Sequence, residues 1–383
     1  MHVAFLTTEY PPLPSGGIGT SIRNLARALV AGGHRATVLV AGAGRAFDDR
    51  GVSVRFTGET RVPKVGWLWD ARRTQRELNG MIRRDGVDVV EAHDWCGPSA
   101  GLRIERPLSV RCHGAAVYFA HLLGERVRPS VRWAEGLALR GASDVVAVSR
   151  FTAELTRHLF RLRAEVGVIP NGIDAAQFAP ATPEEVEPET ILYFGTLARK
   201  KGVLDLCRVF SVVAERRPRA RLLFVGRDAP DSRTGERSTM ALCRELLSAA
   251  ARGRVEFLGA QPYERVQDYV RRAALCVFPS YAEAFPLSWL EAMACAKPVV
   301  GYDTGWAREV VGADGAGGAL VTTGDAEAFV RVVEGLLEDE DARLRMGLAA
   351  RARVEARFTS AHVARQSIEH YEGLLRARTN RAA

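Results

Sequence analysis

Two glutamates near residue 290 stand out because one of them lies within an apolar run. Glu291 is flanked by leucine, tryptophan, alanine and methionine over 287–294, and Glu283 precedes it by eight positions. A buried charge without partners is costly, so the glutamate needs hydrogen-bond donors. Carboxylates accept hydrogen bonds from hydroxyl groups, and the pattern therefore indicates a ligand rich in hydroxyls, such as a ribose or a sugar. A glutamate paired with a neighbouring arginine is the alternative.

The segment that carries both glutamates has the pattern of a strand, a loop and a helix. The apolar run 275–280 predicts a buried strand, 280–284 forms the loop at its carboxyl end, and a helix starts near Pro286, a residue suited to the first helical turn. Ligands of open parallel sheets bind at this end of the strands. The free N–H groups of Leu287 and Ser288 are placed to bind a phosphate. The sequence therefore predicts adjoining phosphate and hydroxyl sites.

A glycine-rich stretch near the amino terminus offers a second place for an anion. Gly16 and Gly17 in "GGIGTS" precede a helix expected over 21–33 and would expose backbone N–H groups to a phosphate. A turn that requires glycine for a positive φ is the alternative. The dinucleotide fingerprint is not met, because Ile22 stands where a third glycine is required and the next strand ends at Gly42 without an acidic residue.

The elements that must position these residues alternate regularly along the chain. Short apolar runs between helical patterns are typical of βαβ units with parallel sheets. Strands are expected over 2–8, 35–42, 88–93, 108–114 and 144–149, then over 190–196, 220–226, 254–259, 275–280 and 298–303. A segment rich in prolines and turns separates the two sets. We therefore expect two α/β doubly wound domains, 1–170 and 171–359, with a C-terminal helix over 360–383 that packs back on the first.

Composition and charge narrow the classes of function. The chain has 383 residues, of which 47% are hydrophobic and 26% charged, as in globular proteins with large cores. A net charge of +8 suggests a partner that carries phosphate, an anionic membrane or nucleic acid. No basic block interleaved with aromatic residues occurs, so nucleic acid is disfavoured. Lysines are few among many arginines. The pair Lys200–Lys201 therefore indicates positions where lysine has a function, because a position indifferent to chemistry would more often hold arginine.

The cysteines and the amino terminus indicate the cellular compartment in which the protein is expected. Six cysteines without a C-x-x-C pair give no support for a disulfide framework or a structural zinc site. The amino terminus lacks the features of a signal peptide, and no apolar run approaches the roughly 20 residues that span a bilayer. We expect a cytoplasmic protein. The stretch 65–84, with Trp67, Leu68 and Trp69 beside several arginines, predicts either peripheral contact with an anionic membrane or an ordinary helix packed on the sheet.

The stretch "PSYAEAFPLSWLEAMACAKPVV" at 279–300 resembles the signature of the retaining glycosyltransferases of family 4, which have the GT-B fold. Its E-x7-E motif matches Glu283 and Glu291. Further resemblances follow in the family's order: the glycine loop and helix from residue 11, "VRCHG", "VIPNGID" and "YFGTLARKKGV". The resemblance implies two Rossmann-like domains that face each other across a cleft. It covers almost the whole chain.

The resemblance also implies a nucleotide diphosphate sugar as donor, usually with UDP or GDP as the nucleotide. Glu291 matches the residue that accepts from the ribose hydroxyls, and Glu283 the one near the hydroxyls of the donor sugar. Lys201 matches a lysine that compensates the diphosphate charge. The full set of expected donor-binding residues is Gly16, Gly17, Arg199, Lys201, Glu283, Phe285, Leu287, Ser288 and Glu291.

His113 matches the histidine that lies near the donor sugar and the leaving phosphate, so His113, Lys201 and Glu283 are the expected catalytic residues. The family usually has an arginine after Gly195, where this chain has Thr196; Arg199 or Lys200 is the candidate for the second cation.

His93 and Asp94 follow another expected strand. They are candidates for acceptor contact or for hydrogen bonds within a loop, and a metal site formed by these two with Cys112 and His113 is disfavoured.

The implied activity is transfer of a hexosyl unit, with retention of configuration, to a hydroxyl-bearing acceptor that is a small molecule, a glycan or a lipid-linked group. We expect no cofactor and no metal, since no D-x-D motif is placed to hold one. The alternatives are a nucleotide-sugar epimerase or hydrolase of the same fold, and a non-catalytic subunit that binds nucleotide sugars.

Overall fold

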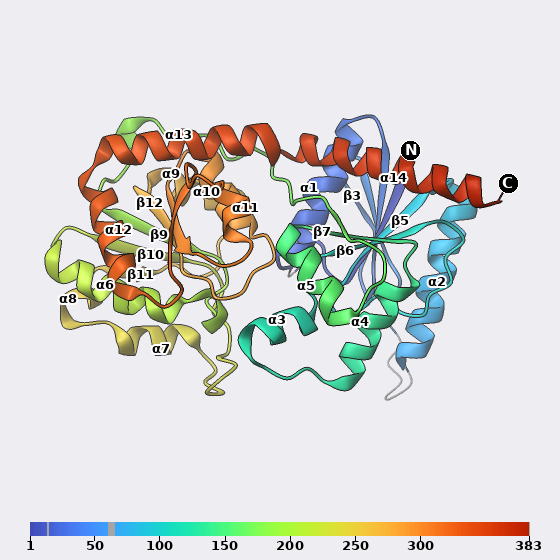
Figure 1. Ribbon diagram of the computed structural model, residues 1–383, viewed down its shortest axis with the longest axis horizontal. Helices are drawn as coiled ribbons and strands as arrows, with labels where there is room; N and C mark the ends of the chain where they lie inside the picture. The colour runs from blue at the N-terminus through green and yellow to red at the C-terminus, as the bar shows by residue number, and fades with distance from the viewer. Residues whose placement is uncertain (14, 60–65, 383) are drawn as a thin grey trace. The chain divides into compact units, whose positions relative to one another are not determined.

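The computed structural model describes residues 1–13, 15–59 and 66–382, and its chain divides into two units (Figure 1). Unit 1 comprises Met1–Ile173 together with Thr359–Ala383, and unit 2 comprises Asp174–Phe358. The boundaries expected after residues 170 and 359 lie within a few residues of these limits. Each unit has its own sheet with helices packed against it, and the strands are parallel except for one edge strand of unit 1.

Within the described residues, the sheet of unit 1 has the strand order β3-β4-β2-β1-β5-β6-β7-β8. Every neighbouring pair is parallel except β3 and β4, which are antiparallel. The strands are β1 (His2–Thr7), β2 (Arg35–Val40), β3 (Phe47–Asp49), β4 (Val52–Phe56), β5 (Val89–His93), β6 (Leu108–Cys112), β7 (Asp144–Ala147) and β8 (Gly167–Val168). The expected strands are all present, and β3, β4 and β8 are additions.

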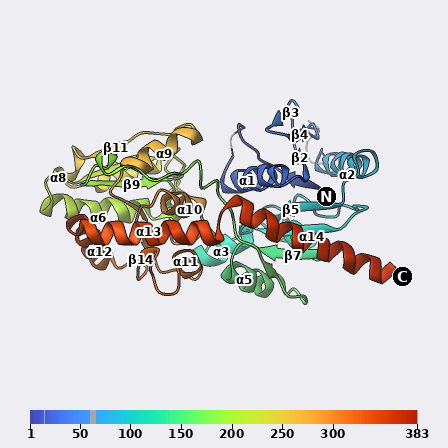
Figure 2. The same ribbon diagram turned by 90° about the horizontal axis from the view of Figure 1, so that it is seen from above.

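The helices of unit 1 cover both faces of this sheet. They are α1 (Gly17–Ala31), α2 (Gly66–Asp85), α3 (Ala116–Leu123), α4 (Pro129–Gly141), α5 (Arg150–Phe160) and α14 (Ser360–Ala382). Figure 2 shows α1 and α2 on one side of strands β5 and β7, and α5 on the other. Helix α1 buries Ile22, Leu25 and Leu29 against the side chains of the sheet.

Helix α14 belongs to unit 1 through both apolar and polar contacts. Val363 and Tyr371 join the same core as α1 and the strands. The Tyr371 hydroxyl donates to Glu91 Oε2 at 2.5 Å. The guanidinium of Arg111 donates to both oxygens of Glu91 at 2.9 Å and to Ser367 Oγ at 3.1 Å. Because a buried charge needs paired partners, this network ties the C-terminal helix to β5 and β6.

The described part of unit 2 contains a parallel sheet with the order β11-β10-β9-β12-β13-β14. Its strands are β9 (Thr190–Phe194), β10 (Arg221–Val225), β11 (Val255–Phe257), β12 (Leu275–Phe278), β13 (Val299–Tyr302) and β14 (Gly318–Val321). The chain runs outward from β9 to β11 and then returns to place β12 on the other side of β9. The strand order therefore reverses between β9 and β12, the place where open α/β sheets bind ligands.

The connections of unit 2 supply its helices. The short helices are η1 (Pro183–Glu185), η2 (Arg199–Lys201), α8 (Ala249–Arg252) and α11 (Ala307–Val311). The longer ones are α6 (Val203–Arg216), α7 (Thr239–Leu246), α9 (Tyr263–Arg272), α10 (Leu287–Ala294), α12 (Ala326–Glu338) and α13 (Glu340–Arg357). Helix α10 packs against α13 and buries Trp289 and Met293. Among the described helices of the chain, none is both long and apolar enough to cross a membrane.

Candidate functional site

In unit 2, the loops after β9 and β12 are held together at the reversal of strand order. Residues 191–192 of β9 pair in parallel with residues 275–276 of β12, so both strands end at the same edge. The Tyr281 N–H donates to the Lys200 carbonyl at 2.9 Å. Gly202 has φ +71°, and a Cβ there would lie 1.8 Å from the Pro279 carbonyl oxygen. Only glycine permits this approach, which fixes one loop against the other.

The same junction brings together two of the expected catalytic residues. Lys201, in η2, forms an ion pair through its Nζ with Oε1 of Glu283, in the loop after β12. Glu283 is 7% exposed, whereas the lysine side chain remains partly accessible. The two residues are 82 positions apart in the chain. An accessible cation thus lies beside a largely buried carboxylate at the edge where a ligand of this sheet would bind.

Glu291 lies on the buried face of α10 and is 4% exposed. The hydroxyl of Tyr263, the first residue of α9, donates to its Oε1 at 2.6 Å. Sequence reasoning did not identify Tyr263. The two residues are separated by 28 positions, with strand β12 between their helices, so no local spacing signals their contact.

The start of α10 differs slightly from expectation. Pro286 precedes the helix, with φ −74° and ψ 126°, and the first helical residue is Leu287. Pro286 is therefore the N-cap residue and not part of the first turn, because its ψ is extended. The N–H groups of Leu287 and Ser288 still lie in the first turn, where helices leave them unpaired by their own backbone. The ring of Phe285 packs edge-on against Phe358, with centroids 5.4 Å apart.

Arg199 forms a bidentate ion pair that sequence reasoning missed. Its Nε and Nη2 donate to the two carboxylate oxygens of Asp231 at 2.6 and 2.9 Å. Asp231 also accepts from the Thr234 N–H and hydroxyl. Hydrogen bonds from Arg199 hold the pKa of Asp231 well below its usual range. Arg199 therefore anchors η2 to the loop after β10, and a donor contact by Arg199 or by Lys200 stays a prediction.

In unit 1, the carboxyl ends of β1, β5 and β6 gather the residues predicted there. The Thr8 N–H lies 3.4 Å from His93 Nε2, which joins the loop after β1 to the end of β5. Asp94, directly after β5, accepts the backbone N–H of His113 on Oδ1 at 2.9 Å. His113 is thus held at the end of β6 by the neighbouring strand's loop.

Burial dominates the electrostatics of this cluster. It lowers the pKa of His93 to about 4 and raises the pKa of Asp94 to about 7. Burial, followed by the charge of Arg111, lowers the pKa of His113 well below its ordinary value. His113 is therefore neutral at physiological pH, with one ring nitrogen able to donate and the other able to accept. Within the described residues, Asp94 Oδ2 and His93 Nδ1 are buried without a hydrogen-bond partner.

The glycine stretch differs from the reading that requires a positive φ, and phosphate binding by its N–H groups stays a prediction. Gly16 is the N-cap residue of α1 with φ −102°, and Gly17 is its first residue, so neither takes a positive φ and the helix starts four residues before 21. The reason is Glu9, whose Oε1 accepts the Gly19 N–H at 2.7 Å. A Cβ at Gly19 would lie 3.0 Å from the Glu9 carbonyl oxygen. The amino end of α1 therefore already contacts a carboxylate of this chain.

Helix α2, proposed above for either membrane contact or packing, packs through Leu78, Met81 and Ile82, which are buried. Trp69 is 54% exposed, and the guanidinium carbon of Arg72 lies 5.8 Å from its ring centroid. The side chains of residues 67 and 68 lie outside the described residues. Packing on the unit thus accounts for one face of the helix, and contact with a membrane stays a prediction.

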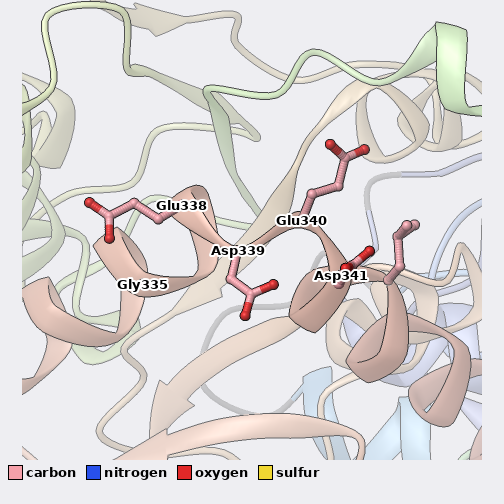
Figure 3. A pocket seen from close by; sticks show the side chains of 6 residues that line it. Gly335, Glu338, Asp339, Glu340 and Asp341 are labelled. Atoms are coloured by element: carbon pink, nitrogen blue, oxygen red, sulfur yellow. The ribbon is translucent and has the colours of Figure 1, made fainter.

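An acidic hollow at the junction of α12 and α13 has a structural explanation. Figure 3 shows its carboxylates pointing in different directions instead of toward one point. Asp339 accepts the Ala342 N–H at 2.8 Å as the N-cap of α13, and Glu338 accepts from Arg217 at 3.2 Å. In the part of the chain that the structure describes, no cluster of three or more His, Cys, Asp or Glu residues could hold a metal ion. The lining is Gly335, Glu338, Asp339, Glu340, Asp341 and Leu344.

Two parallel-sheet Rossmann-like domains define the GT-B class, and solved structures of that class are similar to this chain over nearly its full length. Sucrose-phosphate synthase from Thermosynechococcus elongatus has a TM-score of 0.80 at 21% identity, with 98% of this chain and 99% of that chain covered. HepE of Anabaena in complex with UDP and glucose has a TM-score of 0.76 at 21% identity, with 97% and 99% covered.

The sequence comparisons are more specific. The model of "Glycosyltransferase Family 4" matches residues 15–177, and that of "Glycosyl transferases group 1" matches 175–353. Alpha-maltose-1-phosphate synthase of Mycolicibacterium smegmatis is 29% identical, covering 97% of this chain and 99% of that protein. D-inositol 3-phosphate glycosyltransferase of Nocardia farcinica is 31% identical, covering 79% and 69%. The chain belongs to glycosyltransferase family 4, and it is a glycosyltransferase.

Proposed function

We propose that this glycosyltransferase transfers a hexosyl unit from a nucleotide diphosphate sugar to a hydroxyl-bearing acceptor, with retention of configuration and without a metal ion. The observation that carries the proposal is the meeting of Lys201 and Glu283 at the reversal of strand order in unit 2. A cation, a carboxylate and the start of α10 adjoin there, and these are the groups that a diphosphate and a sugar require.

The proposed chemistry relies on stabilising the leaving group. Negative charge grows on the diphosphate as the glycosidic bond breaks, and Lys201 with the N–H groups at the start of α10 would offset that charge. Glu283 would accept from hydroxyls of the transferred sugar, and Glu291 from those of the ribose. The acceptor would attack from the face that the diphosphate leaves, with the diphosphate taking the proton, so that no protein nucleophile is needed.

His113 has properties suited to a place beside the sugar. Its imidazole is neutral, and Asp94 holds its backbone in position at the end of β6. A neutral imidazole can donate to a sugar hydroxyl or phosphate oxygen without the cost of burying another charge.

The comparisons support a nucleotide sugar as donor and UDP as the first nucleotide to test. HepE was solved with UDP and glucose and also with UDP-glucose. Two relatives are named alpha-maltose-1-phosphate synthase and D-inositol 3-phosphate glycosyltransferase, and both names contain a phosphorylated small molecule. These names favour a small phosphorylated molecule as the acceptor. A glycan or a lipid-linked group is the alternative acceptor.

A thermal-shift panel of UDP, GDP and their sugars tests the donor class. A ligand at about 100 times its dissociation constant stabilises the bound form by about 2.7 kcal/mol, which is a measurable shift. Products formed from the best donor with a panel of sugar phosphates and inositol phosphates would then be analysed by NMR for anomeric configuration. An inverted product would overturn retention, and conversion of the donor without any acceptor would favour an epimerase or hydrolase. A panel without any shift would argue for a different donor class.

A further inference from the structure

Tyr263 makes a contact with the buried carboxylate of α10 that neither spacing nor motif predicts. Its hydroxyl donates to Glu291 Oε1 at 2.6 Å, from the first residue of α9 to the middle of α10. The donated proton is the only one that a tyrosine hydroxyl has. The short distance to a charged acceptor is typical of a charge-assisted hydrogen bond.

The tyrosine ring is itself held in place. It packs edge-on against Phe178, with ring centroids 5.8 Å apart and an interplanar angle of 69°. Phe178 is fully buried, and its carbonyl accepts from Arg351 Nη1 at 3.3 Å. A hydroxyl on a packed ring has little freedom to move, so it can fix the orientation of the carboxylate that it contacts.

A carboxylate has two oxygens and about four positions for hydrogen-bond donors, and Tyr263 uses one of them. That bond sets the direction in which the other lone pairs of the Glu291 carboxylate point. We propose that Tyr263 is a positioning residue for ribose recognition, which orients the Glu291 carboxylate toward the ribose hydroxyls and so favours ribonucleotides over 2′-deoxyribonucleotides. This inference rests on the proposed function, in which Glu291 binds the ribose of the donor.

A purely structural role would have a different signature. If Tyr263 only satisfied a buried charge, loss of its hydroxyl would lower stability and leave the preference for ribose unchanged. If it orients Glu291, the loss would weaken binding of the ribonucleotide more than that of its deoxy analogue. The ratio of the two affinities therefore separates positioning from structural support.

The test compares Tyr263→Phe with the unaltered full-length chain by calorimetric titration of UDP and 2′-deoxy-UDP, with GDP and 2′-deoxy-GDP in parallel. We expect Tyr263→Phe to weaken ribonucleotide binding about tenfold, the effect of one hydrogen bond to a charged group, and deoxynucleotide binding less than about twofold. Tyr269→Phe is the matched control, because it removes a hydroxyl from the C-terminal half of the same helix, whereas Tyr263 at its start contacts Glu291. It should leave both affinities unchanged.

The Glu291→Gln variant separates failure of this inference from failure of the proposed function. If Glu291→Gln abolishes the preference for ribose and Tyr263→Phe does not alter it, the positioning role is wrong while the donor site stands. If neither variant alters the preference, or if neither UDP nor GDP binds the unaltered chain, the proposed ribose site fails, and the inference with it. Thermal unfolding without ligand checks that each variant is folded.

Discussion

At the scale of single residues, Lys201 pairs with Glu283 in the structure. In the proposed reaction it also faces the diphosphate, which becomes more negative as the glycosidic bond breaks. We expect Lys201→Ala to lower kcat by about 10²–10³, the range for loss of one group that stabilises developing charge. Binding of the intact nucleotide sugar should weaken less, because its ground-state diphosphate carries less charge at the oxygen that bridges phosphate and sugar. Steady-state kinetics and calorimetry measure the two effects. Equal losses would place the lysine in ground-state binding only.

Asp94 provides a pH dependence whose sign follows from its burial. Its pKa is raised to about 7, first by burial and further by the charge of Glu135, while an unfolded aspartate has a pKa of about 3.9. Between about pH 4 and 7 the folded state therefore holds a proton that the unfolded state has released. The contribution of Asp94 to stability is present in acid and is lost as the pH rises to about 7.

His93 and His113 act in the opposite direction, because their pKa values are lowered on folding. Their contribution is lost as the pH falls below about 6.5. We therefore predict that Asp94→Asn gains stability relative to the unaltered chain as the pH rises from about 4 to about 7. Thermal unfolding at several pH values measures this difference. A difference that does not vary with pH would show that Asp94 has an ordinary pKa in the folded state.

At the scale of elements, the junction of the loops after β9 and β12 depends on one glycine. Gly202→Ala would place a methyl group on the Pro279 carbonyl oxygen, at a φ that already disfavours side chains. We expect the variant to lose more than about 3 kcal/mol of stability, or to displace the loops and with them the Lys201–Glu283 pair. Urea unfolding and donor binding report the two outcomes.

Gly324→Ala is the matched control for this variant. Gly324 has φ +85° in unit 2, but a Cβ there would meet no atom within 4 Å. It should therefore cost only about 1–2 kcal/mol, from backbone strain alone. Equal losses of stability in Gly202→Ala and Gly324→Ala would show that the close approach of Gly202 to Pro279 does not contribute to the loss.

The attachment of α14 to unit 1 gives a second prediction at this scale. Tyr371→Phe removes one of the donors to Glu91, while the Arg111 guanidinium continues to pair with it. We expect a loss of about 1–3 kcal/mol, because a hydrogen bond to a buried charged group is removed without leaving that group unpaired. Urea unfolding followed by a probe in unit 1 measures the loss. A loss below about 0.5 kcal/mol would mean that apolar packing alone holds the helix.

At the scale of the whole molecule, the proposed function does not require a divalent ion. Cationic side chains and helix termini would meet the charge of the diphosphate, and activity should therefore survive dialysis against EDTA. The measurement compares rates before and after chelation, with readdition of magnesium or manganese as the control. Activity that disappears on chelation and returns with either ion would overturn a metal-independent mechanism.

Much of the architecture could be predicted from the sequence, because buried parallel strands are short apolar runs that local patterns reveal. The strands β3, β4, β8 and β14 were missed because they are short or lie at or near the edge of their sheet. The start of α1 was placed too late because glycines are poor helix formers, and the compensating carboxylate of Glu9 lies outside the helix.

What the sequence determined by itself is the fold class, the family, and the types of residue at the strand ends, since these depend on composition, alternation and local motifs. The tertiary structure decided which of those residues meet. The pairs Lys201–Glu283, Arg199–Asp231 and Tyr263–Glu291 join segments 82, 32 and 28 positions apart. No local spacing encodes such contacts, because they arise only when parallel strands bring the loops at their carboxyl ends to a common edge.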